Sequence, residues 1–141
     1  MTISKESLGR MLDEIEYVLA QMQQTASPQQ ALYTFSAVHG VVNRVMNFEC
    51  DPVLVFAHQV LSTAHATFSS QFGTMGDRPN GPAVAAELLT LLQHSITGFS
   101  VALQSGGEAQ VHQALQRIAN ITYAMTGNGY YLYTRGKLKL G

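Results

Sequence analysis

Five histidines are the side chains of this 141-residue sequence with the clearest potential for chemistry. They are His39, His58, His65, His94 and His112. A metal centre needs three or four ligands that converge on one ion. His58 and His65 would share a helix face, but seven residues place them roughly 10 Å apart along the axis. No histidine follows an acid by three positions, as the di-iron bundles require. Ligation would therefore need single histidines from different helices, and we predict no metal site.

His39 interrupts an otherwise apolar helical stripe between Phe35 and Val42. Buried polar groups are normally hydrogen-bonded, so one interpretation is a core imidazole bonded to a neighbouring helix. The other is a ligand-binding or proton-transfer site inside the bundle. Under that second interpretation His39, His58, His65 and His94 are the candidate ligand-binding residues.

Covalent catalysis and phosphate binding lack their usual sequence patterns. Ser62 lies within helical reach of His58 and His65, but no glycine-flanked nucleophile turn accompanies it. The sequence contains neither a GxxxxGK[ST] loop nor a GxGxxG motif after a strand. We predict no catalytic residues and no cofactor, which favours a protein that is not an enzyme.

The last twelve residues, YYLYTRGKLKLG at positions 130–141, alternate apolar and polar side chains. This alternation predicts a short β-hairpin with Arg135 and Gly136 in its turn, or else an extended tail. A disordered or helical terminus is the alternative. Cations interleaved with tyrosines could also contact a nucleic-acid backbone and stack on bases. The candidate residues of this interaction tail are Tyr131, Tyr133, Arg135, Lys137 and Lys139.

Residues typical of helix starts and helix ends recur through the rest of the chain. Ser27-Pro28 and Asp51-Pro52 each place a capping side chain before a proline at the first helical position. Pro82 is expected to begin a fourth helix, and Ser105 with Glu108 would form a capping box for a fifth. Gly73 is expected to end the third helix in a left-handed conformation, and Gly127 and Gly129 to end the fifth.

Apolar residues recur at three- and four-residue spacing in each of these segments, which is typical of amphipathic helices. With short connections between them, they predict an all-α, five-helix up-and-down bundle over residues 1–129. Residues 130–141 would form a C-terminal hairpin or tail packed on the same domain or on a partner.

Charged residues make up only 12% of the chain, against about 25% in typical proteins. Between Pro52 and Thr134 the charged residues are Asp77, Arg78, Glu87, Glu108 and Arg117. Leu88–Gly107 is an uncharged twenty-residue stretch, but polar side chains interrupt it, so we expect no membrane span. They include Gln93, His94, Ser95, Thr97, Ser100 and Gln104. No segment is typical of a signal peptide and the single Cys50 excludes an internal disulfide, so we expect a cytoplasmic protein.

Interface centres are depleted of charged residues, so the uncharged later helices predict a surface that faces other polypeptide. We therefore expect a non-enzymatic interaction or assembly module that forms a homodimer or binds a protein partner. One alternative is a small-molecule or metal-binding bundle that uses the core histidines. A second is a nucleic-acid accessory protein that uses the tail, although the net charge of −1 argues against a nucleic-acid partner.

Overall fold

The computed structural model describes residues 3–25, 27–105 and 107–140. Within these ranges the chain forms six α-helices and one short 3₁₀ helix, without strands. In chain order they are α1 (Lys5–Gln23), α2 (Pro28–Phe48), α3 (Pro52–Phe72), η1 (Met75–Asp77), α4 (Gly81–Ser105), α5 (Glu108–Met125) and α6 (Gly127–Thr134). The prediction of an all-α fold is confirmed.

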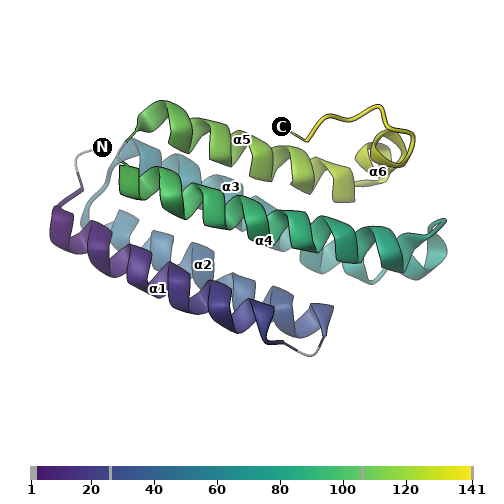
Figure 1. The fold of residues 1–141 in the computed structure, drawn as a ribbon, viewed down its shortest axis with the longest axis horizontal. Coiled ribbons are helices and arrows are strands. Elements are labelled where there is room, and N and C mark those ends of the chain that lie inside the picture. The colour runs from purple at the N-terminus through teal and green to yellow at the C-terminus, as the bar shows by residue number, and fades with distance from the viewer. Residues whose placement is uncertain (1–2, 26, 106, 141) are drawn as a thin grey trace.

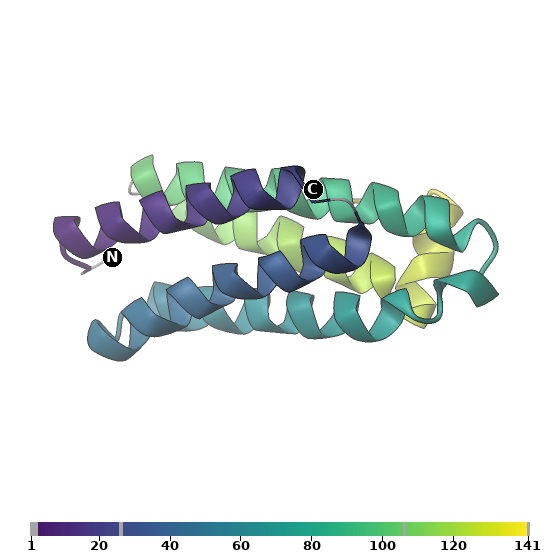
Figure 2. The same ribbon diagram turned by 90° about the horizontal axis from the view of Figure 1, so that it is seen from below.

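The five long helices lie side by side along the longest axis of the molecule (Figure 1). Their neighbours do not follow chain order throughout. α1 packs on α2 and α2 on α3, but α3 then packs on α5, which packs on α4, and α4 returns to α1. α5 therefore lies between α3 and α4, and it runs in the same direction as α3 (Figure 2).

The starts of the first three helices follow from local capping. The side-chain oxygens of Ser4, Ser27 and Asp51 accept hydrogen bonds from backbone amides of the first turns of α1, α2 and α3. Each bond satisfies a donor that has no partner within the helix. These caps lie within three residues of their targets, and the predictions for Ser27 and Asp51 are confirmed.

Two predicted caps are wrong. Gly73 ends α3 in the right-handed helical region, with φ −66° and ψ −18°. Ser105 is the last residue of α4, and its hydroxyl donates back to the carbonyl of Ala102 at 3.0 Å. Glu108 is accordingly the first residue of α5 and not its third, and Gly107 caps that helix without a side-chain bond.

The core is one continuous apolar cluster to which all six α-helices contribute. Its largest fully buried members include Met11, Ile15, Phe35, Leu54, Phe68, Leu92, Phe99 and Tyr130. Asp51, Ser95 and Thr122 are the buried polar residues of the described chain. None of the helices in the described ranges is long and apolar enough to cross a membrane.

The prediction of five helices followed by a β-hairpin is wrong, because residues 127–134 form the sixth helix. The Thr126 hydroxyl caps α6 by accepting from the amide of Gly129 at 3.2 Å. A Cβ at Gly129 would stand 1.8 Å from the carbonyl oxygen of Tyr123, so glycine permits the tight turn between α5 and α6. Gly127 and Gly129 thus belong to the first turn of α6, and α5 has already ended before them at Met125.

Arg135 and Gly136, expected to form the hairpin turn, instead end α6. Gly136 has φ +70°, and its amide donates to the carbonyl of Tyr133 at 3.0 Å. The amide of Lys137 donates to the carbonyl of Leu132 at 2.8 Å. These two bonds form a Schellman motif, in which a left-handed glycine satisfies the last carbonyls of a helix.

α6 lies across one end of the bundle, roughly perpendicular to the long helices (Figures 1 and 2). Tyr130 is 1% exposed, and its hydroxyl donates to the carbonyl of Pro79. The guanidinium of Arg78 lies 5.0 Å from the centre of the Tyr130 ring. It also donates to the carbonyl of Met125 at 3.0 Å and to the Gln71 side chain. Arg78 therefore joins the ends of α3, α5 and α6.

After α6 the chain turns back along α5 (Figure 1). Leu138 and Leu140 pack as partly buried residues against the core. Leu140 lines a cavity of about 320 Å³ with Leu91 of α4 and Ile121 of α5. Burial of these two leucines holds the segment on the bundle without a strand partner.

Candidate functional sites

Three of the four candidate histidines meet between α2 and α3. The ring centre of His39 lies 5.2 Å from that of His65 and 6.0 Å from that of His58. His58 and His65 stand two turns apart on α3, and His39 enters from α2 between them. We call His39, His58 and His65 the histidine cluster. Tertiary packing brings together side chains that spacing along one helix keeps apart.

His39 is half-buried, and its Nδ1 is buried without a hydrogen-bond partner among the described residues. The bond to a neighbouring helix that one interpretation of the sequence required is therefore not observed at this nitrogen. Burial lowers the pKa of His39 from its ordinary value, and the imidazoles of His65 and His58 lower it further. Both causes act in one direction because each disfavours a positive charge on the ring.

The cluster borders a groove of about 470 Å³ between α2 and α3. The groove is lined by Gln29, Leu32, Tyr33, His65, Ser69, Phe72 and Gly73. The Ser69 hydroxyl lies 3.5 Å from Nε2 of His65, so the polar groups of the groove adjoin one another. Its walls combine aromatic and aliphatic surface with a few hydrogen-bonding groups, which is typical of small-molecule sites.

His94 does not join the histidine cluster. It lies exposed on α4 and lines the cavity that also contains Leu140 and Arg117. Within the described part of the chain, no three histidine, cysteine or acidic side chains are placed to hold one metal ion. The structure thus brings together His39, His58 and His65 and leaves His94 apart.

The candidate residues of the interaction tail are divided between different surfaces. Tyr131 and Tyr133 point to nearly opposite sides of α6, because two residues correspond to about 200° of helical rotation. The Tyr133 hydroxyl donates to the Glu87 carboxylate of α4, whereas Tyr131 is exposed. Arg135 caps α6, and Lys137 and Lys139 lie exposed in the segment that follows. The tyrosines do not form the continuous stacking surface that the alternating pattern suggested.

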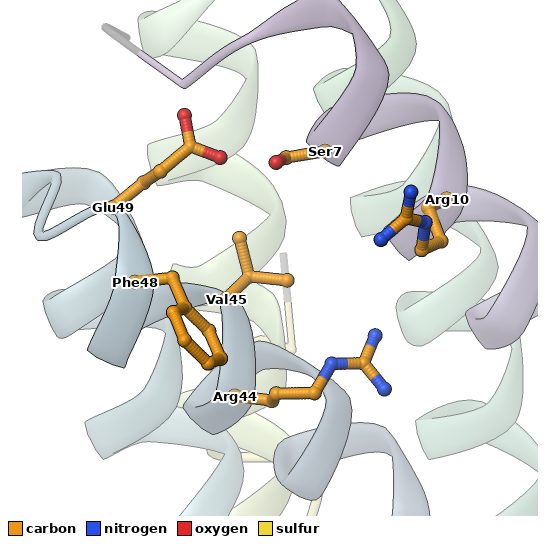
Figure 3. A pocket seen from close by; sticks show the side chains of 6 residues that line it. All are labelled: Ser7, Arg10, Arg44, Val45, Phe48 and Glu49. Atoms are coloured by element: carbon orange, nitrogen blue, oxygen red, sulfur yellow. The ribbon is translucent and has the colours of Figure 1, made fainter.

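A surface pocket of about 290 Å³ lies where α1 begins and α2 ends, between Ser7, Arg10, Arg44, Val45, Phe48 and Glu49 (Figure 3). Its charged groups have partners. Arg10 pairs with Glu6 at 3.1 Å, and Arg44 pairs with Glu14. Hydrogen bonds from Ser7 and Ser4 lower the pKa of the exposed Glu49 carboxyl. This paired arrangement connects the N-terminal turn to the end of α2.

A different surface, between α3 and α5, is formed by residues without formal charge and includes exposed aromatic side chains. Phe56 is 47% exposed and Tyr123 is 40% exposed. A shallow apolar groove of about 150 Å³ separates the two helices, lined by Gln59, Val60, Thr63, Ala119 and Thr122. We call these seven residues, together with His112, the α3–α5 face. The His112 ring packs edge-to-face on Phe56, with ring centres 5.6 Å apart.

The sequence analysis did not single out Phe56 or Tyr123. A usable indication was present, because Phe56 falls outside the buried stripe of Val53, Ala57 and Leu61. An aromatic residue out of phase with the core stripe is expected on the surface.

Comparison of the chain with family models, curated proteins and solved structures finds no match.

Proposed function

We propose that this protein is a non-enzymatic assembly module that associates with a second copy of itself through the α3–α5 face. The observation that carries the proposal is that this face exposes aromatic side chains and contains no formally charged residue. Aromatic residues are enriched and charged residues depleted at the centres of protein interfaces.

The absence of charge follows from the sequence of the two helices. α3 contains no Asp, Glu, Lys or Arg, and its two histidines belong to the histidine cluster on the side of α2. α5 contains Glu108 at its first position and Arg117. Arg117 lines the cavity shared with α4, away from the groove toward α3. Burial of the α3–α5 face therefore removes no formal charge from water, and burial of an unpaired charge is costly.

A second copy fits this face better than a charged partner. Two identical uncharged faces meet without electrostatic repulsion, and the whole chain has a net charge of only −1. α3 and α5 are parallel, so Phe56 and His112 lie at one end of the groove and Tyr123 lies toward the other. A twofold axis that lies in the plane of the face and perpendicular to the two helices would place the Phe56 end of one copy against the Tyr123 end of the other. Such a self-complementary contact is the commonest way to close a homodimer.

Sedimentation equilibrium from micromolar to millimolar concentration tests the proposal. The natural chain should show a concentration-dependent dimer. Phe56→Glu, which places a charge within the face, should shift the equilibrium to monomer with an unchanged helical circular-dichroism spectrum. Val101→Glu is the matched control, because Val101 is 60% exposed on α4, outside the face. A monomer at every concentration, or equal dimerisation of both variants, would overturn the proposal.

A second candidate function is small-molecule binding in the α2–α3 groove. The size of the groove favours this function. About 470 Å³ lies within the range of roughly 300–1,000 Å³ that such sites occupy. Apolar contact would come from Leu32 and Phe72, and hydrogen bonds from His65 and Ser69. Native mass spectrometry of the purified protein should then show the added mass of a bound molecule. The Leu32→Trp variant, in which the indole fills the groove, should lack that added mass. Protein of unmodified mass throughout would count against this candidate.

A further inference from the structure

The histidine cluster contains three titratable rings in contact at the packing surface of two long helices. The central ring, His39, touches both of the others, with ring centres 5.2 Å and 6.0 Å away. The ring of His65 also packs edge-to-face on Phe35 at 5.9 Å. While the rings are neutral, these contacts are ordinary packing between aromatic groups.

Protonation of the histidine rings makes the contact between α2 and α3 less favourable. Two positive rings at these distances repel each other, and the repulsion is stronger where water is partly excluded. A positive His39 would also present a charged Nδ1–H at a position that is buried without a partner among the described residues. A buried donor without an acceptor costs more when it is charged.

The charged groups on the neighbouring helices do not offset this repulsion. α2 packs on α1 and α3, and α1 presents Glu14 to α2, where it is paired with Arg44. α5, the other neighbour of α3, presents His112 to Phe56. Tyr33 is the remaining titratable group of the groove beside His65. Within the described residues, the causes that shift the pKa of His39 are burial and the imidazoles of His65 and His58, and none of them is a carboxylate.

We propose that the histidine cluster is an acid-sensitive contact that holds α2 on α3 when its rings are neutral and weakens that contact when they are protonated. The proposal does not depend on self-association through the α3–α5 face. Histidine is the side chain whose charge ordinarily changes between about pH 5 and 8, so the device would respond to mild acid.

The direction of the pH dependence follows from linkage. The pKa of His39 is lowered in the folded protein, so the unfolded chain binds the proton more tightly. Stability is then complete above the ordinary histidine value of 6.5 and is lost as the pH falls through it toward the lowered value. Each pKa unit between the two states increases the unfolding equilibrium constant about tenfold. The pKa of the Glu49 carboxyl is also lowered, but the stability that this carboxyl contributes is lost only as the pH falls below its ordinary value of 4.5. The two effects therefore occupy different pH ranges.

Urea unfolding of the full chain between about pH 7 and pH 5 tests the proposal, since this range spans histidine protonation. The unfolding equilibrium constant of the natural chain should rise as the pH falls. His39→Leu should lose much of that rise, because it removes the central ring and its unpaired nitrogen. His94→Leu is the matched control, since His94 lies outside the cluster, and it should keep the rise. Equal pH dependence of both variants would overturn the proposal.

A second measurement does not depend on the folding of a variant. Titration of the histidine ring protons by NMR in the natural chain should show one ring that gains its proton below the ordinary histidine pKa of 6.5. Assignment of that ring to His39 would support the proposal. Protonation of His39 at or above its ordinary pKa would refute it.

Discussion

Replacement of Arg78 by methionine should detach α6 from the end of the bundle. The guanidinium donates to the Met125 carbonyl and to the Gln71 side chain, and it lies over the Tyr130 ring. A hydrogen bond from a charged donor contributes about 1.5–3 kcal/mol, and a cation–π contact about 0.5–2 kcal/mol. Methionine keeps part of the packing, and the three contacts share one side chain, so the full sum is not expected. We expect a loss of about 3 kcal/mol, or about 10 °C in Tm for a chain of this size.

Thermal and urea denaturation followed by circular dichroism measure this loss. Arg117→Met is the control, because Arg117 is exposed on α5 and such substitutions change stability by about 0.5 kcal/mol or less. Tyr130→Phe removes only the hydroxyl that donates to Pro79 and should cost about 1 kcal/mol. If Arg78→Met were no more harmful than Arg117→Met, the role given to Arg78 in closing the bundle would be refuted.

Two glycines provide further tests of the helices, both measured as urea midpoints against the natural chain. Gly136→Ala should destabilise by about 1 kcal/mol because φ is +70° there, and an unchanged midpoint would contradict the helix end described for α6. Gly40→Ala should instead stabilise by up to about 1 kcal/mol, since Gly40 is exposed within α2 and a Cβ there meets nothing within 4 Å. A lower urea midpoint for Gly40→Ala would contradict the exposed position described for Gly40 on α2.

Much of the helical content could be predicted because helix starts are local. Ser27 and Asp51 accept bonds from amides two or three residues away, so residue types and spacing suffice to identify them. The buried stripe of α2, from Leu32 through Phe35, Val38 and Val42, likewise follows from one helical period. Ser105 failed as a cap because α4 continues through it, and local pattern alone cannot tell the last turn of one helix from the cap of the next.

The C-terminal segment was mispredicted for a related reason. Alternation from Tyr131 to Lys139 fits a hairpin, but a spacing of three between Tyr130 and Tyr133 also fits a helix, and short helices are marginal alone. The contacts of Tyr130 with Pro79 and Arg78, about fifty residues earlier in the chain, favour the helix. Thr126 before the glycines and Gly136 after the tyrosines were the local indications of its two ends.

By itself the sequence determined that this chain is helical, where α2 and α3 begin and which faces of the helices are apolar, because these properties depend on neighbours within about one turn. Only the tertiary structure decided that α5 packs between α3 and α4, that His39 lies between His58 and His65, and that Phe56 remains exposed on an uncharged face. Those arrangements depend on which helices pack together. Packing is set by the fit of whole apolar surfaces, which spacing along a single helix does not reveal.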